Sequence, residues 1–587
     1  MVNSLLFSQQ PFEFERTWGT YFGPAGTQMA GIYHQKGILF DSQKNMYMRG
    51  SMWNYSNFPA SYFNQFVLGG GTSINNPPQH NRFEAAVSAQ GTPFFFGFYP
   101  YVSGNRLEAI DSQNHQYRIL YGSSLPVQAT PNVFLPNDPD PSSPKKILLA
   151  KYSSAGTLAW ATYLPSSHED VQVITDPTGN VYISNKTLIT SNITTTGVWQ
   201  ENFDIFYDPQ GMMIPNYYLL KLNPDGQGIW ASYLPSGVEE MLFHNNALYI
   251  RSGRNTNPNL NTMATPGAYQ TTLADLSITK IDAAAGNRLW GTYYGTPMGN
   301  NMEVATGMAI NETGIYITGT DYNYTGLNFF GNPASYKQTV EGGSDLFLFK
   351  FSLSGMWEWS TYFGSSGTDM NHYDKTIALN GNEVYITGNS YGNTNNIATT
   401  GSHQEFQELN TANAINHYFA KFNSSGNFIW CSYYGGTSFS HIDVPLNIAI
   451  DNGVLFLFGN TNSNTGYTTE GAWMPQRVPQ STGNDLTSFI ARFDNKSLST
   501  SEVRNTDLQL YNNPNDGNFY LSGDILKKDH CIMAIYNTAG RIVKQETLSK
   551  EETQYFPFEG NLLSGVYFVT ISHHDGKPIK TFKMMVK

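Results

Sequence analysis

The chain has 587 residues, and its charged side chains make up 13% of the sequence while its aromatic side chains make up 14%. The 33 basic and 45 acidic residues give a formal net charge of −12 without a lysine–arginine cluster, which argues against nucleic acid and anionic membranes as partners. No run of about 18 apolar residues is present, so no transmembrane segment is predicted. The many Tyr, Phe and Gly residues favour short strands and turns, and therefore an all-β protein.

The first residues, Met1 to Gln10, combine a short apolar stretch with small and polar side chains. This is typical of the end of a secretory signal peptide, and we expect residues 1–15 to be a signal-peptide remnant or a disordered tail. The two cysteines, Cys431 and Cys531, fall in different predicted domains. A disulfide between them is therefore not expected.

A short pattern, Trp18-Gly19-Thr20-Tyr21, recurs along the chain and marks one strand of a repeat. Further copies begin at Trp160, Trp230, Trp290, Trp359 and Trp430, and in a degenerate copy Phe95 and Phe98 replace Trp and Tyr. An apolar run, a tight turn and an aromatic strand usually follow, which together predict a β-hairpin. A polar excursion, expected to be a loop, then leads to a strand that ends in a basic residue. These basic residues are Lys151, Lys221, Lys280, Lys350, Lys421 and Arg492, and we expect their stems to cover apolar surface.

Four antiparallel strands repeated seven times predict a seven-bladed β-propeller over residues 16–495. The array begins with a Trp strand that lacks partners and ends with three strands that lack a Trp strand. We therefore expect residues 16–22 to pair with residues 487–494, which closes the ring. The Trp strand is predicted to be the outermost strand of each blade, with its indole packed between blades.

The repeat resembles a known bacterial family. Its pattern is clearest in the segments Asp345 to Lys350, Gly355, Trp359 to Gly364, and Gly381 to Gly388. This pattern is similar to the SBBP-type β-propeller repeats, and the likeness extends over roughly residues 16–495. The resemblance implies a propeller, and it implies no general catalytic chemistry.

A polar linker is predicted at 496–506, and a second module at 507–587. Turn formers at Pro514 to Gly517, Asn537 to Gly540 and His574 to Gly576 predict a small β-sandwich. The module also contains Asn513 to Phe519, Ile535 to Arg541, Leu563 to Val569 and Lys583 to Lys587. In order and spacing these segments resemble the type A C-terminal sorting domain of the Bacteroidota type IX secretion system. The resemblance implies an Ig-like sandwich, recognition of residues 507–587 by the secretion machinery, and a secreted or cell-surface location.

Three predicted loops contain a His-x-Asp pattern, in which extended backbone places both side chains on one side. The pairs are His168 with Asp170, His372 with Asp374, and His441 with Asp443, while other repeats place Glu108, Glu240 and Glu303 in the comparable loop. Histidines and carboxylates placed in this way could form a ligand-binding site, bind a cation or act as a general acid and base. Aspartates also commonly cap turns through their own backbone. No fixed-spacing metal motif, phosphate loop or nucleophile elbow is found, so catalytic residues, metal and cofactor are not assigned.

The sequence leaves more than one function open. The first hypothesis is a non-catalytic secreted or cell-surface binding or scaffold protein, whose loop-rich face binds an extracellular glycan, peptide or surface protein. The alternative is a secreted hydrolase or lyase that acts on a polysaccharide with acidic and histidine residues of that face. A structural role in an extracellular matrix is a further hypothesis.

Overall fold

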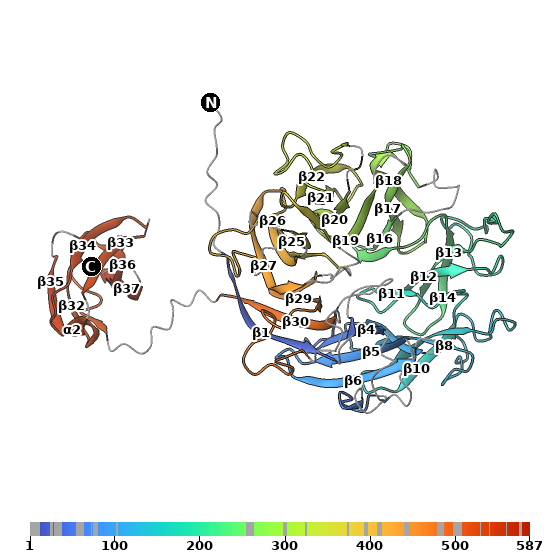
Figure 1. Ribbon diagram of the computed structural model, residues 1–587, viewed down its shortest axis with the longest axis horizontal. Coiled ribbons are helices and arrows are strands. Elements are labelled where there is room, and N and C mark those ends of the chain that lie inside the picture. Colours follow the sequence, from blue (N-terminus) through green and yellow to red (C-terminus); the bar gives the residue numbers. More distant parts are fainter. Residues whose placement is uncertain are drawn as a thin grey trace. The chain divides into compact units, whose positions relative to one another are not determined.

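The protein was analysed as a computed structural model, and it forms two compact units, Met1–Asn495 and Lys496–Lys587 (Figure 1). The structure describes residues 12–23, 27–28, 38–53, 64–71, 73, 80–100, 104–253, 263–297, 302–322, 324, 326–371, 375–392, 397–407, 414–438, 446–477, 486–496, 508–528, 530–538, 540–558, 560, 562–573 and 578–587. Strands dominate both units, which confirms the all-β prediction.

The described residues of the first unit form seven antiparallel sheets of four or five strands. The first sheet consists of β2 (Thr27–Gln28), β4 (Met46–Trp53), β5 (His80–Val87) and β6 (Pro93–Pro100), with β3 (Leu39–Phe40) paired to β4. The next three consist of β7 (Gly104–Ile110), β8 (Gln116–Gly122), β9 (Lys146–Tyr152) and β10 (Leu158–Tyr163); of β11 (Gln172–Thr175), β12 (Val181–Thr187), β13 (Asn216–Leu222) and β14 (Gly228–Leu234); and of β15 (Glu240–His244), β16 (Ala247–Ser252), β17 (Ala274–Asp282) and β18 (Arg288–Pro297). The last three consist of β19 (Glu303–Asn311), β20 (Gly314–Asp321), β21 (Asp345–Phe351) and β22 (Trp357–Phe363); of β23 (Thr368–Met370), β25 (Glu383–Tyr391), β26 (Ile415–Asn423) and β27 (Phe428–Ser438), with β24 (Ile377–Asn380) paired to β25; and of β28 (Leu446–Asp451), β29 (Val454–Thr461), β30 (Thr487–Asn495) and β1 (Phe14–Phe22).

The sheets lie around a common centre in a β-propeller-like arrangement (Figure 1). One strand at the inner edge of each sheet contacts the corresponding strand of the next sheet, in the series β3, β7, β11, β15, β19, β24 and β28. The Trp strands, such as β10 and β22, stand at the opposite edge of their sheets. The Trp strand is therefore the outer strand, as the sequence predicts.

Neighbouring sheets are joined by one repeated contact. The indole N–H of Trp160 donates to the carbonyl of Pro224 at 2.8 Å, in the turn that precedes the next Trp strand. The Nζ of Lys151 donates to the same carbonyl at 3.2 Å and lies over the ring of Tyr117. Gly226, at φ 82°, packs on the indole so closely that a Cβ would come within 2.8 Å of it. A glycine is therefore required in this turn.

The same contact recurs at the next three junctions. Trp and Lys donate to one carbonyl in the pairs Trp230 and Lys221 on Ala283, Trp290 and Lys280 on Leu353, and Trp359 and Lys350 on Ser424. We expected these lysines to cover apolar surface with their stems. In the structure they also bind the neighbouring sheet, so their charge contributes to the junction.

The junction that faces the closing sheet is different, because that sheet begins and ends with separate parts of the chain. Here Glu13 replaces the turn carbonyl: its Oε2 accepts the indole N–H of Trp430 at 2.7 Å, and its Oε1 accepts from Lys421 at 2.7 Å. Phe12 takes the place of the glycine, with its ring centroid 4.7 Å from that of Trp430. Residues just before β1 therefore supply what a turn supplies elsewhere.

Strand β1 closes the ring by pairing antiparallel with β30. The register runs from Phe14 opposite Asn495 to Phe22 opposite Ser488. This confirms the predicted pairing of residues 16–22 with residues 487–494. The expected tail at 1–15 is too long, because Phe12 and Phe14 are already buried against the neighbouring sheet. Residues 1–11 lie outside the described part of the chain.

The polar excursions protect the outer edges of the sheets. In the β7–β10 sheet, the amide of Thr130 donates to Ala161 at 2.8 Å, and the amide of Tyr163 donates to Leu135 at 3.0 Å. Equivalent bonds join Thr195 to Ala231, Thr265 to Gly291, Thr399 to Cys431 and Thr469 to Gly19. The excursions therefore cover edges that would otherwise offer unpaired backbone groups to another chain.

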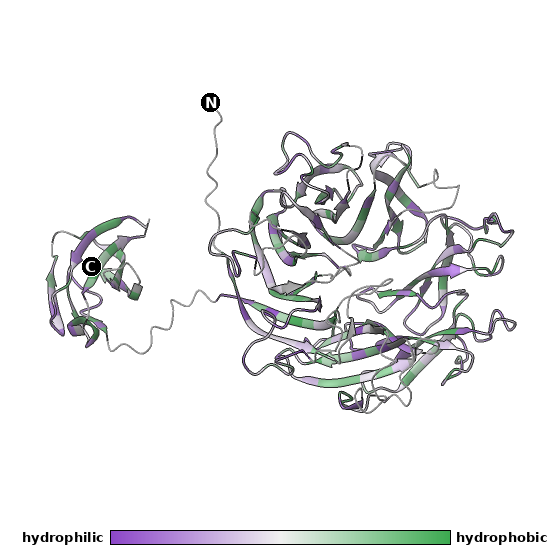
Figure 2. Cartoon of the chain, in the orientation of Figure 1, coloured by the Kyte–Doolittle hydropathy of each residue, from purple (hydrophilic) through white to green (hydrophobic). Residues whose placement is uncertain are grey.

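The second unit has two antiparallel sheets around one apolar core, and in Figure 2 its strands, like those of the first unit, carry hydrophobic stretches. The sheets consist of β31 (Gln509–Tyr511), β32 (Asn518–Ser522) and β35 (Thr553–Pro557), and of β34 (Ile542–Thr547), β33 (Cys531–Asn537), β36 (Gly565–His573) and β37 (Pro578–Val586), with a short helix α2 (Ile525–Lys528). Cys431 and Cys531 are both buried and lie in different units, so no disulfide joins them.

The contact made by Glu13 is predicted to stabilise the fold. Replacing Glu13 with Ala leaves Trp430 and Lys421 without their shared acceptor, so we expect the free energy of unfolding to fall by about 1 to 3 kcal/mol. Chemical denaturation measures this change. Glu15→Ala is the matched control, because Glu15 is an exposed glutamate two residues further along, on β1. Equal stability of the two variants would contradict the role of Glu13.

Candidate functional site

Of the three predicted His-x-Asp pairs, the structure describes His168 with Asp170. His168 Nδ1 lies 3.2 Å from Asp170 Oδ2, in the loop that precedes β11, and half of the imidazole is exposed. The hydrogen bond with Asp170 raises the pKa of His168 above its ordinary value. The other predicted residues, His372, Asp374, His441 and Asp443, lie outside the described residues.

Asp170 belongs to a network of buried charges at the junction of three sheets. Arg106 on β7 reaches Asp170 Oδ1 at 3.3 Å and donates to the carbonyl of Glu169 at 2.6 Å. It also pairs with Glu108 on the same strand, which accepts a second ion pair from Arg49. Although burial raises the pKa of Asp170, the bond from His168 and the charge of Arg106 outweigh it and hold this pKa below its ordinary range.

Buried polar side chains, two of them from this network, connect the inner strands of neighbouring sheets. Side chains donate to backbone carbonyls of the next sheet in the pairs Arg49 on Leu107, Arg106 on Glu169, Gln172 on Val238 and Arg251 on Ala305. A buried guanidinium or amide that satisfies a neighbouring carbonyl removes the cost of leaving both unpaired. These groups therefore have a structural role, whatever else they do.

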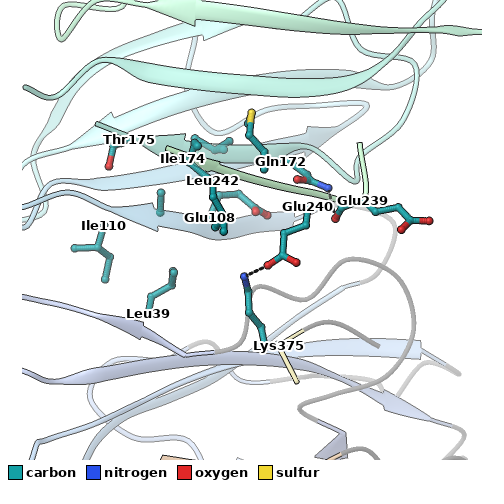
Figure 3. A pocket seen from close by; sticks show the side chains of 13 residues that line it. Leu39, Glu108, Ile110, Gln172, Ile174, Thr175, Glu239, Glu240, Leu242 and Lys375 are labelled. Carbon is teal, nitrogen blue, oxygen red and sulfur yellow. Dashed lines mark hydrogen bonds and ion pairs between the residues drawn. The ribbon is translucent and has the colours of Figure 1, made fainter. Parts of the chain in front are cut away.

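A cavity of about 230 Å³ opens among the inner strands at the centre of the ring (Figure 3). Its lining residues are Leu39, Glu108, Ala109, Ile110, Gln172, Val173, Ile174, Thr175, Glu239, Glu240, Met241, Leu242 and Lys375. They come from β3, β7, β11 and β15 and their ends, together with the loop before β24. Most of the wall is apolar, and the charged groups stand on one side of it (Figure 3).

The charged side of the cavity contains an ion pair between separate sheets. Lys375 Nζ lies 2.5 Å from Glu240 Oε1, and Glu240 Oε2 accepts the amide of Met308 at 2.8 Å. Arg251 pairs with Glu239 at 2.5 Å and approaches Glu240 at 3.5 Å. The carboxylates of this wall are therefore held by cations of the protein.

Glu108, Glu240 and Glu303 were expected in comparable loops, but they lie on strands β7, β15 and β19. Glu108 and Glu240 line the cavity, whereas Glu303 does not. Burial raises the pKa of Glu303 to about 7, against the bonds that it accepts from Thr296. The arginines and Lys375 were missed, because their partners are set by the ring and not by a repeated motif.

The described residues contain no group of three or more His, Cys, Asp or Glu side chains placed to hold a metal ion. Among the same residues, no helix is long and apolar enough to cross a membrane.

Comparison with known proteins addresses the second unit most directly. Residues 509–587 match the secretion system C-terminal sorting domain. The chain carries a type IX sorting domain. It is exported by that system and is secreted or displayed on the cell surface. No curated protein matches the chain.

Several solved structures resemble parts of the chain at low identity. BamB from Moraxella catarrhalis is 10% identical over 81% of this chain and 99% of its own, with a TM-score of 0.32. A member of the DUF4221 family from Bacteroides vulgatus is 10% identical over 83% of this chain and 100% of its own, with a TM-score of 0.28. A fungal alcohol oxidase in complex with copper is 8% identical over 97% of this chain and 99% of its own, with a TM-score of 0.33.

The contact between His168 and Asp170 predicts that the protein's stability depends on the protonation of His168. The stabilisation from charged His168 is complete below about pH 6.5, and it is lost as the pH rises through the raised pKa of His168. In Asp170→Asn, we expect the midpoint of His168, followed by NMR, to move to lower pH. An unchanged midpoint would show that Asp170 is not the cause of the shift.

Proposed function

We propose that this protein is a secreted or cell-surface, non-catalytic seven-bladed β-propeller that binds an extracellular ligand in its central cavity. The ligand class is a glycan, a peptide or a surface protein. The seven sheets of the first unit and the SBBP-type repeat pattern support the blade count. The second unit is proposed to be an Ig-like sandwich that the type IX machinery recognises.

One observation carries the proposal for binding. The cavity joins an apolar wall, which includes Leu39, Ile110 and Leu242, to a charged side with Glu240 and Lys375 (Figure 3). Ligand sites commonly combine a mostly apolar lining with a few placed polar groups. The charged groups are paired within the protein, which favours binding over acid–base catalysis at this position.

A second candidate function rests on the loop before β11. The half-exposed imidazole of His168 is oriented by Asp170, as a general base of a polysaccharide-acting hydrolase or lyase requires. A screen for polysaccharide turnover tests this alternative. Activity that is lost in His168→Ala would support it, and activity that survives would remove His168 as a candidate.

The binding proposal is tested by filling the cavity. Thr175 is half-buried at the cavity wall, so Thr175→Trp places a large ring in the space that a ligand needs. On glycan and peptide arrays, we expect this variant to lose binding by about tenfold or more, which is at least 1.4 kcal/mol. Thr157→Trp, in an exposed turn, is the matched control. Equal binding by both folded variants would contradict a ligand site in the cavity.

A further inference from the structure

The carboxylate of Glu240 is held so that one oxygen faces the cavity. Its residue is 5% exposed, and its Oε2 accepts the backbone amide of Met308 from the next sheet at 2.8 Å. Its Oε1 receives the ammonium of Lys375 at 2.5 Å (Figure 3). The carboxylate is therefore fixed by the main chain, while its second oxygen binds a primary ammonium.

That ammonium comes from a distant part of the ring. Lys375 lies just before β24, two sheets beyond the sheet of Glu240, and its carbonyl accepts the amide of Ile448 at 2.9 Å. Its backbone has a φ of 74°, a conformation that residues with a Cβ adopt at a cost. The side chain is 28% exposed, so solvent reaches the ion pair.

The charges of this wall leave a place for one exchangeable cation. Glu239 and Glu240 bring two negative charges, and Arg251 and Lys375 bring two positive ones. Arg251 is 1% exposed and donates to the carbonyl of Ala305 in the next sheet, so it is fixed between two sheets. Lys375 is the more exposed of the two cations, and its departure leaves one negative charge in excess at Glu240.

We propose that the cavity binds the lysine side chain of an extracellular peptide or protein, whose ammonium takes the place of Lys375 on Glu240. This inference rests on the proposed function and specifies its ligand. Lys375 then serves as an internal competitor that neutralises the carboxylate when no ligand is present.

The rest of the cavity suits such a side chain. Leu39, Ile110, Ile174 and Leu242 form an apolar wall beside Glu240, and methylene groups of a lysine stem pack favourably on apolar surface. At about 30 Å³ per water molecule, a cavity of about 230 Å³ holds several waters, which a stem would displace. The site therefore offers contacts to both parts of the ligand.

The test changes the competitor and the carboxylate separately in the full chain. The probe is the labelled peptide acetyl-Gly-Gly-Lys-Gly-Gly-amide, with norleucine in place of lysine as the neutral control, and binding is measured by fluorescence anisotropy. Lys375→Met keeps the stem and removes the charge, so we expect lysine-peptide binding to tighten about tenfold or more. Glu240→Gln is expected to weaken it about tenfold or more. Unchanged or weaker binding by Lys375→Met would overturn the proposal, as would equal binding of the norleucine peptide.

A second variant keeps the test decisive if Lys375→Met does not fold. Lys375→Arg retains the charge and binds a carboxylate through two parallel bonds, so it is a stronger competitor and is expected to weaken lysine-peptide binding. Butylammonium chloride, compared with sodium chloride, distinguishes a free amine from a peptide: binding as tight as that of the peptide would overturn the assignment to a polypeptide. If Thr175→Trp abolishes array binding while the lysine peptide binds no variant, the cavity remains a ligand site and the lysine assignment fails.

Discussion

The fold depends on the hydrogen bonds and packing contacts that join each sheet to the next. At four junctions a tryptophan and a lysine bind one carbonyl in the neighbouring turn, over a glycine that leaves room for the indole. Each contact satisfies the hydrogen-bond donor of a buried indole and also buries the apolar surface of its ring. Both contributions are lost if the sheets separate. At the closing sheet there is no such turn, and Phe12 and Glu13 provide its equivalent. Residues ahead of the first strand therefore complete the junction between the closing sheet and the sheet of Trp430.

The candidate site follows from this closed ring. Inner strands from different sheets converge at the centre, where Arg106, Gln172 and Arg251 satisfy carbonyls of neighbouring strands. The same convergence brings Lys375 to Glu240, although they are 135 residues apart in the sequence. The ion pair is thus a product of the ring's geometry, and the cavity lies beside it.

Much of the fold can be predicted from the sequence, because it repeats. The Trp pattern locates each outer strand. Because the array begins with an unpartnered Trp strand and ends with three strands that lack one, it also predicts the pairing of β1 with β30. The contact of Glu13 cannot be found in this way, since it occurs once and replaces a backbone group. The partners of Arg49 and Lys375 are equally hidden, because a charged residue inside a strand or loop shows no partner until neighbouring sheets are placed.

The site is less predictable than the fold, because its residues come from different sheets. His168 Nδ1 and Asp170 Oδ2 lie 3.2 Å apart, but a bend at residues 167–169 brings them together, and not the extended backbone that the spacing predicts. The same spacing does not reveal that Arg106 comes from another sheet to hold Asp170. The binding role of the His-x-Asp pairs stays a prediction, and the cavity depends on residues that no motif unites.

Amide hydrogen exchange of β1 tests the central claim most directly. If β1 is an integral outer strand that closes the ring, the amides of Thr20 and Tyr21 exchange as slowly as those of Thr361 and Tyr362 in β22, through the same cooperative opening. Rapid exchange of β1 while β22 and β30 stay protected would show that the ring holds without it, and would contradict the account.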